Sequence, residues 1–518
     1  MMADSDMKKP VSTAGDAVRD LPSEADAGSA DQMLVSLGYT PELSRNRSTL
    51  QVAFMSFVLA SIPYGLATTL YYPLVGGGPV NIIWGWVAVS MIIICVAASL
   101  GEITSVYPTA GGVYYQTFML APPRWRRIAA WTCGWLYVVG NVTITLAVNF
   151  GTTLFLIGCV NVFETADGQD LLAGESYQVF LIFLAITLLC NAVSSLGNKW
   201  LPILDTFAIF WTFAGVIAIM ACVLAIAKEG RHDASWVFTH FEANSGWTPG
   251  WSFVVGLLHA AYATSSTGMI ISMCEEVRAP ATQVPKAMVL TVCINTVAGL
   301  MFMIPLVFVL PDIQGLVVLA QPVPVIIKSA VGNSGGAFGL LIPLLVLALI
   351  CGIGCTTAAS RCVYAFARDG AIPGSKWWKQ INHNLDDVPL NAMMLSMAVQ
   401  IILGLIYFGS SAAFNAFSGV GVIALTASYA TPIIVSMLNG RQTVRTGSFY
   451  LGPIGWFCNI VSLCWSLLAI PLFCMPTTVP VLDPSLMNYA SVVFVGFTAI
   501  SAGWYVAWGR KNYSGPPT

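Results

Sequence analysis

Long apolar stretches separated by short polar connections fill this chain from about residue 51 to residue 509. A helix needs about 20 apolar residues to cross the hydrocarbon core of a bilayer. Twelve stretches satisfy this length, and the third is long enough to tilt or to project from the membrane. They are residues 51–75, 80–103, 128–158, 177–197, 203–227, 252–274, 287–310, 336–360, 389–408, 412–438, 454–476 and 488–509. The pattern predicts an all-α polytopic membrane protein with 12 transmembrane helices.

Small and polar residues interrupt the first and the sixth of these stretches near mid-depth. The first contains Pro63-Tyr64-Gly65, and the sixth contains the run TSSTG from Thr264 to Gly268. Each stretch is the first of five, residues 51–227 and 252–438, and an odd number of helices places the two sets in opposite orientations. Interrupted helices at matching positions of inverted repeats indicate the binding site of a secondary transporter, because unwound backbone must line a polar cavity. Close helix packing is the alternative use of small residues at any single break.

Composition excludes a soluble protein. The chain is 57% hydrophobic and 9% charged, whereas soluble domains carry about 25% charged residues. Of its 22 Lys and Arg residues, 19 fall in connections on the side of the N-terminus, which predicts that both termini are cytoplasmic. Polar residues 1–50 are expected to form a disordered cytoplasmic tail. Residues 454–509 hold the last two helices, and residues 510–518 form a short C-terminal tail. The 13 cysteines include no Cys-x-x-Cys pair, so neither a metal nor a cofactor is expected.

Three blocks of sequence carry a family resemblance. They read GGGPVNIIWGW…SLGEITSVYPTAGGVYYQTFMLAPP (76–123), MCEEVRAPATQVPKAM (273–288) and TTAASRCVYAFARDGAIP (356–373). These blocks resemble the amino acid–polyamine–organocation (APC) permeases, and more narrowly they are similar to the fungal amino acid/choline/GABA permease branch. The resemblance implies a five-plus-five inverted repeat with broken helices 1 and 6, followed by two C-terminal helices. It also implies alternating access driven by an ion gradient.

The resemblance assigns roles to particular residues of this sequence. It implies that both breaks bind substrate and that charged residues near the cytoplasmic helix ends form a gate or carry protons. In sodium-coupled relatives, hydroxyls of the eighth helix hold an ion. The implied substrate-binding residues are Pro63, Tyr64, Gly65, Leu66, Ala67, Thr68, Tyr262, Ala263, Thr264, Ser265, Ser266, Thr267 and Gly268. The implied gate or proton-coupling residues are Glu102, Glu276, Arg361 and Arg368, and the possible ion site is Thr356, Thr357 and Ser360.

The coupling residue is left open by the sequence. Some proton-coupled relatives place a lysine from the fifth helix beside the first, but residues 203–227 contain none. Glu102 and Glu276 are the next candidates, and a structural salt bridge is the alternative role for each. His259 stands alone in the sixth helix and is interpreted as a hydrogen-bonded packing residue.

The substrate class is also left open. No Lys, Arg, Asp or Glu lies at mid-depth in any predicted helix. A zwitterionic amino acid can be held by backbone dipoles, whereas a quaternary amine such as choline needs an aromatic cage. Candidates for a cage are Tyr64, Trp135, Tyr137, Trp211, Tyr262 and Phe414, with packing as the alternative role of each.

The expected function is secondary active import of amino acids or related small amines, such as GABA or choline, at the plasma membrane. The expected partners are the substrate, a proton (or sodium) as coupling ion, and the lipid bilayer, and no nucleic acid is expected. The sequence shows no nucleophile–base pair that would suggest an enzyme. A non-transporting nutrient sensor on the same fold is the alternative, although tails of about 50 and about ten residues are short for a sensor.

Overall fold

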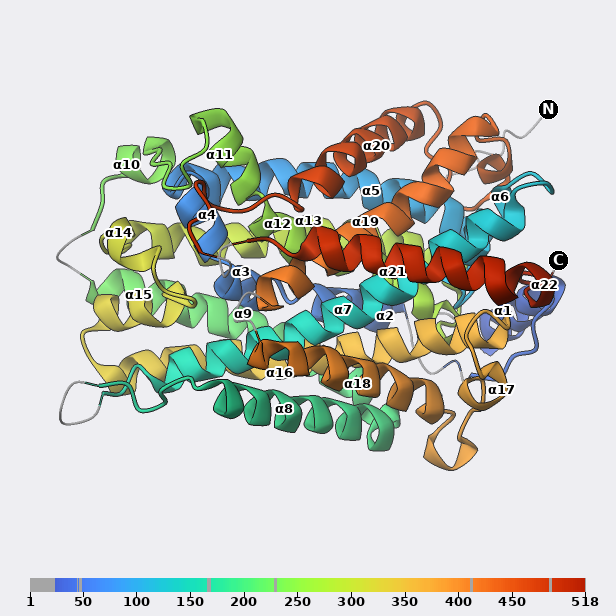
Figure 1. Ribbon diagram of the computed structural model, residues 1–518, viewed down its shortest axis with the longest axis horizontal. Coiled ribbons are helices and arrows are strands. Elements are labelled where there is room, and N and C mark those ends of the chain that lie inside the picture. The colour runs from blue at the N-terminus through green and yellow to red at the C-terminus, as the bar shows by residue number, and fades with distance from the viewer. Residues whose placement is uncertain are drawn as a thin grey trace, which may run out of the picture.

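The computed structural model describes residues 24–43, 45, 49–164, 169–227, 231–409, 413–483 and 487–517. Twelve helices within these ranges are long and apolar enough to cross a membrane, which confirms the predicted number. Most of them run along the long axis of the molecule (Figure 1). The described residues contain two isolated β-bridges and no named strand.

The first and sixth spanning helices are each built from several pieces, and the others are continuous or nearly so. The spanning elements are α2 (Thr49–Ala60) with α3 (Ile62–Thr68), η2 (Asn81–Gly85) with α5 (Trp86–Val106), α7 (Arg126–Val160), α8 (Ser176–Leu196), α9 (Leu201–Ile226), α11 (Pro249–Gly256) with α12 (Leu258–Thr264) and η4 (Ser265–Glu276), α13 (Pro280–Phe308), α16 (Ser334–Arg368), α18 (Leu390–Gly404) with η6 (Leu405–Phe408), α19 (Ala413–Leu438), α20 (Ile454–Leu472), and α21 (Ala490–Trp504) with η9 (Tyr505–Gly509).

Short helices occupy the two ends of the bundle. At the end that carries both described termini lie α1 (Glu24–Ser36), α6 (Gly112–Leu120), α17 (Ser375–Trp378) and α22 (Arg510–Asn512) (Figure 1). We call this the terminal end. At the opposite end lie α4 (Tyr71–Gly76), α10 (Ala234–Thr239), α14 (Ile313–Leu316) and α15 (Pro322–Val331). Short 3₁₀ turns cover Asn198–Trp200, His383–Leu385 and Thr443–Thr446.

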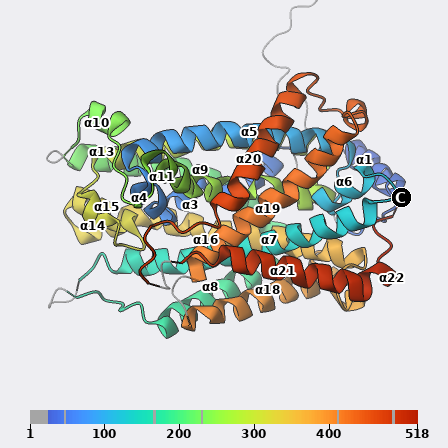
Figure 2. The same ribbon diagram turned by 45° about the horizontal axis from the view of Figure 1, so that its top comes forward.

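The packing of the long helices follows an inverted repeat. The third helix of each half, α7 or α16, is 35 residues long, and the two pack against each other. Helix α7 also packs against α19, the last helix of the other half, and α16 packs in the same way against α9. The second helices, α5 and α13, likewise form a pair. Each of these three contacts has its counterpart after exchange of the halves, as a five-plus-five arrangement requires. Helix α20 packs against α5 and α19, and α21 lies beside α7 and α19 (Figure 2).

The predicted disorder of residues 1–50 is wrong for residues 24–43. Helix α1 and the segment after it are described, and Leu34, Tyr39 and Leu43 are buried with exposed fractions of 3%, 6% and 7%. A composition argument misses this because three apolar anchors are enough to dock a short segment on an existing bundle. Residues 1–23 lie outside the described ranges.

Candidate functional site

The break in the first spanning helix falls at Ser61. This residue lies between α2 and α3 with φ of 38° and ψ of 53°, in the left-handed region that side chains rarely adopt. The sequence placed the break at residues 63–67, but those residues are helical and buried. The difference has a simple cause: Pro63 lies in the first turn of α3, where proline is tolerated because its missing N–H is not needed. The proline therefore begins a helix instead of interrupting one.

The break in the sixth spanning helix falls where the sequence placed it. Helix α12 ends at Thr264, and the chain continues as a 3₁₀ helix of 12 residues, although 3₁₀ runs longer than about four residues are uncommon. Hydroxyl groups accompany the tight turns. Ser265 Oγ donates to the Tyr262 carbonyl at 2.8 Å, and Thr267 Oγ1 donates to the Thr264 carbonyl at 2.7 Å. These side-chain bonds satisfy carbonyls near the change of winding, which accounts for the Ser/Thr-rich run.

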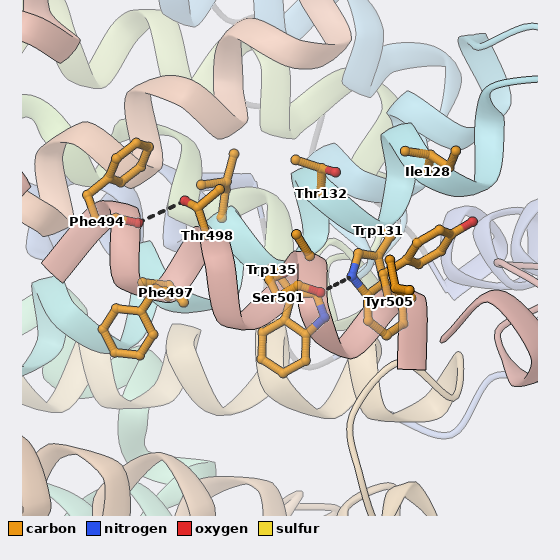
Figure 3. A pocket seen from close by; sticks show the side chains of 13 residues that line it. Ile128, Trp131, Thr132, Trp135, Phe494, Phe497, Thr498, Ser501 and Tyr505 are labelled. Carbon is orange, nitrogen blue, oxygen red and sulfur yellow. Dashed lines mark hydrogen bonds between the residues drawn. The ribbon is translucent and has the colours of Figure 1, made fainter. Parts of the chain in front are cut away.

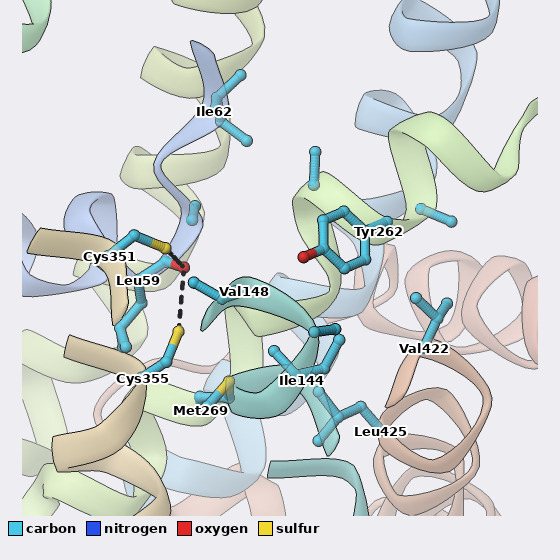
Figure 4. Close-up of a cluster of buried hydrophobic side chains, with 14 of the residues drawn as sticks. Leu59, Ile62, Ile144, Val148, Tyr262, Met269, Cys351, Cys355, Val422 and Leu425 are labelled. Atoms are coloured by element: carbon cyan, nitrogen blue, oxygen red, sulfur yellow. Dashed lines mark hydrogen bonds between the residues drawn. The ribbon is translucent and has the colours of Figure 1, made fainter. Parts of the chain in front are cut away.

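The two breaks meet around a small cavity of about 10 Å³. This volume is about that of one water molecule, so the site is closed. Figure 4 shows the surrounding cluster, in which side chains of α2, α7, α12, α16 and α19 converge on the break. Of the predicted binding residues, Tyr64, Gly65, Tyr262, Ala263, Ser265 and Ser266 line the cavity, together with Leu59, Ala60, Ile144, Val148 and Cys351. None of these residues is charged, as the sequence led us to expect.

The remaining predicted binding residues are buried near the breaks but do not line this cavity. Thr264 and Thr267 line a neighbouring cavity of about 20 Å³, next to Tyr429. Pro63, Leu66, Ala67, Thr68 and Gly268 line neither cavity.

Two tyrosines fix the position of the unwound segment. Tyr429 Oη donates to the Ser265 carbonyl at 3.0 Å, and Tyr137 Oη donates to the Gly268 carbonyl at 3.2 Å. A Cβ added at Gly268 would lie 2.5 Å from Tyr429 Cε1, so this position accepts only glycine without movement. Sequence reasoning named Tyr137 only as a cage candidate and did not single out Tyr429.

Ion pairs close the terminal end beneath the cavity. Arg368 donates twice to Glu275, at 3.0 and 2.8 Å, and Arg361 Nε donates to Glu276 at 2.7 Å. All four residues are largely buried. These pairs join the end of η4 to the end of α16. The sequence suggested the adjacent Glu275 and Glu276 as an inner gate without assigning their partners, and in the structure each carboxylate has its own arginine.

Glu102 forms a separate ion pair, with Arg441. It accepts from Arg441 Nη2 at 2.5 Å and from the Leu451 amide at 2.8 Å. Both Glu102 and Arg441 are nearly inaccessible, with side-chain exposures of 1% and 2%. The bond ties α5 to the connection between α19 and α20, so Glu102 does not join the pairs at η4.

Tyr39 and Arg45, in the segment before α2, contact the helix ends that carry the ion pairs. Arg45 Nη1 donates to the Val277 carbonyl at 2.6 Å, and Tyr39 Oη contacts both carboxylate oxygens of Asp369 at 3.0 and 2.9 Å. Tyr114 Oη also donates to Asp369, at 2.7 Å. Burial is the main cause that raises the pKa of Asp369 to about 6, against the opposing effects of Arg368 and the two hydroxyls.

This raised pKa predicts a pH-dependent stability. The ordinary pKa is near 3.8, so the penalty for ionising Asp369 in the folded protein is absent below about pH 4 and develops as the pH rises through about 6. A difference of about two pKa units corresponds to about 3 kcal/mol. Asp369→Asn should therefore raise the melting temperature of the purified protein at pH 7.5 and change it little at pH 4. The exposed Asp386→Asn is the matched control, and a difference between Asp369→Asn and wild type that does not vary with pH would contradict this account.

A larger cavity lies at the opposite end. It has a volume of about 720 Å³ and is lined by residues of α7, of the α14–α15 connection and of α15. Gln321 lines this cavity, and its Nε2 donates to the Thr68 carbonyl at 3.3 Å. The closed site is thus separated from the α15 end by contacts such as this one, and from the terminal end by several layers of ion pairs and tyrosines.

The eighth spanning helix presents sulfur, not hydroxyl, to the first break. Cys351 Sγ and Cys355 Sγ lie 3.7 and 3.9 Å from the Leu59 carbonyl (Figure 4). Thr357 Oγ1 instead pairs with Ser194 of α8 at 2.7 Å, and Ser360 Oγ accepts from Arg361 at 3.0 Å. The hydroxyl of the third predicted ion ligand, Thr356, is buried with no partner among the described residues. Two of the three predicted ion ligands, Thr357 and Ser360, are thus hydrogen-bonded to groups other than the first break.

An apolar pocket between two of the spanning helices is not part of this site. It has a volume of about 190 Å³ and lies between α7 and α21, where Trp131 Nε1 donates to the Ser501 carbonyl at 3.2 Å (Figure 3). The cage candidate Trp135 lines this pocket, and Trp211 donates to the Pro343 carbonyl on α16. The side chain of Phe414 lies outside the described residues. Only Tyr64 and Tyr262 of the cage candidates line the cavity at the breaks.

The described residues form twelve spanning helices, of which the first ten make up two sets of five, and the breaks in the first helix of each set meet at mid-bundle. This is the architecture of a secondary transporter. Comparison of the sequence with known families agrees: the chain belongs to the amino acid permease family, whose profile matches residues 48–497. Its relatives include a choline transporter of Saccharomyces cerevisiae, 31% identical over 91% of this chain and 83% of that protein. They also include the amino-acid permease BAT1 of Arabidopsis thaliana, 30% identical over 93% and 95%, and a GABA-specific permease of Saccharomyces cerevisiae, 28% identical over 94% and 86%. The protein is a multi-pass membrane transporter for small molecules.

Proposed function

We propose that this protein imports amino acids or related small amines across the plasma membrane, with both termini in the cytoplasm and with a proton as the coupling ion. The observation that carries the proposal is the meeting of both breaks around an uncharged cavity that ion pairs close on one side. Residues Tyr64, Gly65, Tyr262, Ala263, Ser265 and Ser266 bind the substrate. The permease family and relatives that carry amino acids, choline or GABA support the substrate class.

The chemistry beside the first break supports a proton over sodium. Hard cations bind oxygen ligands, whereas α16 offers the thiols of Cys351 and Cys355 to the carbonyl of Leu59. Thr357 and Ser360, which the sequence suggested as ion ligands, make hydrogen bonds to other groups.

The ion pairs at the terminal end act as the inner gate. Alternating access requires α16 and η4 to separate at this end, so Glu275–Arg368 and Glu276–Arg361 must break or move in each cycle. Arg45 and Tyr39 must leave with them, because they bind the same helix ends. The inner gate is therefore made of charges, while the opposite side is held by weaker contacts such as that of Gln321 with Thr68.

Uptake into permease-deficient cells tests the proposal. The panel is radiolabelled GABA, choline, lysine and alanine, each with and without a protonophore and with sodium replaced. We expect saturable uptake of at least one compound, abolished by the protonophore and unaffected by sodium. Sodium dependence would contradict the coupling, and absence of uptake of all four compounds by protein shown at the cell surface would contradict the importer and favour a sensor.

A further inference from the structure

A buried histidine links the two broken helices on the α15 side of the cavity. His259 lies in α12, six residues before the unwound segment begins at Ser265, and is 1% exposed. Its Nδ1 lies 3.0 Å from Oγ1 of Thr69, the residue that ends α3. The imidazole therefore bridges the two half-helices that meet above the breaks.

The hydrogen-bond pattern determines which ring nitrogen carries the hydrogen. Thr69 Oγ1 donates its single hydrogen to the Gly65 carbonyl at 2.8 Å, so toward His259 it accepts a hydrogen from Nδ1. A neutral imidazole has one N–H group, which leaves Nε2 as a bare acceptor. Nε2 is buried and has no partner among the described residues. A buried acceptor without a donor is unfavourable, and a proton on Nε2 would turn it into a donor that needs an acceptor of its own.

The described elements that pack against α12 supply no free counter-charge to His259. Helix α12 packs against α3, α4, α5, α19 and η4. Among these elements, only α5 and η4 carry carboxylates, and these lie toward the terminal end. All three, Glu102, Glu275 and Glu276, are paired with arginines. The titratable side chains of these elements and of α12 itself are Tyr64, Tyr71, Tyr72, Cys95, Glu102, Tyr262, Cys274, Glu275, Glu276 and Tyr429. An imidazolium at this position therefore needs an anion that arrives with the substrate.

We propose that Nε2 of His259 is the proton-binding site of the transport cycle and that it binds its proton together with a substrate carboxylate. The proton comes from water on the α15 side, forms the Nε2–H bond, and returns to water on the terminal side after the carboxylate has left. The chain of bonds from Nδ1 through Thr69 to the Gly65 carbonyl carries the charge change to the first break. This inference rests on the proposed import function, and it assigns proton coupling to substrates that have a carboxylate, not to choline.

The variant His259→Asn separates proton binding from packing. Asparagine keeps an N–H donor near the position of Nδ1, so the bond to Thr69 is retained, but it does not titrate. Purified full-length protein in liposomes is assayed with radiolabelled GABA, lysine and alanine for two quantities, exchange without a gradient and accumulation driven by a pH gradient. We expect accumulation driven by the pH gradient to fall at least tenfold, and exchange to fall less and to lose its dependence on pH. His383→Asn, at a side chain that is 75% exposed, is the matched control and should change neither quantity.

Retention of proton-driven accumulation by His259→Asn would overturn the proposal. Equal loss of exchange and accumulation would assign a purely structural role to His259.

Thr69→Val provides an independent check. That variant keeps the imidazole but removes the acceptor of its Nδ1–H group, so the pH midpoint of accumulation should shift by at least half a unit. An unchanged midpoint would also contradict the proposal. If the wild-type protein exchanges substrate but does not accumulate it in a pH gradient, the proton site is refuted and the transport function stands. If it exchanges none of the probes, both the proton site and the import function are refuted.

Discussion

Arg368→Ala should abolish uptake and destabilise the protein. Arg368 makes two hydrogen bonds to Glu275, whose side chain is 1% exposed, so the alanine variant leaves a buried carboxylate without its partner. Breaking a buried ion pair from one side costs about 3–5 kcal/mol. The Ala110 amide still donates to Glu275, but one neutral donor does not replace a bidentate arginine. Uptake of the identified substrate and the melting temperature of the purified protein measure the two effects.

A double variant distinguishes the lost charge partner from a general defect. Arg368→Ala combined with Glu275→Gln removes the uncompensated carboxylate, so it should regain much of the melting temperature while transport stays impaired because the gate is gone. Arg445→Ala, at an exposed arginine of the same end, is the matched control and should behave as wild type. Wild-type stability in the single variant would mean that the pair does not close the inner gate.

Gly268→Ala should reduce the initial rate of uptake at least tenfold without preventing folding. The new Cβ would meet the Tyr429 ring at 2.5 Å, and this ring is held by its bond to the Ser265 carbonyl. Relief of the clash requires either the ring or the unwound backbone to move. Overpacking of this kind costs about 1–3 kcal/mol, and about 1.4 kcal/mol corresponds to a tenfold change in an equilibrium or a rate.

Surface expression and a second glycine serve as controls for this variant. Gly250 lies at the start of the same spanning helix, and a Cβ added there meets no atom within 4 Å. Gly250→Ala should therefore transport normally at normal surface expression. Normal uptake by Gly268→Ala would show that the contact between η4 and Tyr429 does not define the working site.

The spanning helices and the second break were predictable because their signals are local. Apolar length marks a membrane helix, and the run from Thr264 to Gly268 contains the hydroxyls that later bond to the turns of the unwound segment. The first break was misplaced by two residues because a proline was taken as the end of a helix when it marks a beginning. The distinction depends on whether Ser61, two residues before the proline, adopts a left-handed conformation, which the local sequence does not require.

The pairing of the gate was not predictable because its members are distant in the sequence. Glu275 and Arg368 are 93 residues apart, and Tyr39 and Asp369 are 330 residues apart. Two carboxylates and two arginines at the same end of the bundle can pair in more than one way. The register of η4 against α16 selects the pairing that is observed. The tail shows the same limit, since the burial of Tyr39 depends on a surface formed by other helices. His259 is buried and hydrogen-bonded, as the sequence indicated, but only the structure shows that its bond to Thr69 leaves Nε2 without a partner among the described residues.

The central claim is that substrate binds where the two helix breaks meet. A cryo-EM map of the purified protein with the substrate found by the uptake panel tests this most directly. We expect density in contact with Tyr64, Tyr262 and Ser266, in a cavity enlarged from its present volume of about 10 Å³. Density confined to the cavity of about 720 Å³ at the α15 end, with the breaks still closed, would contradict the claim.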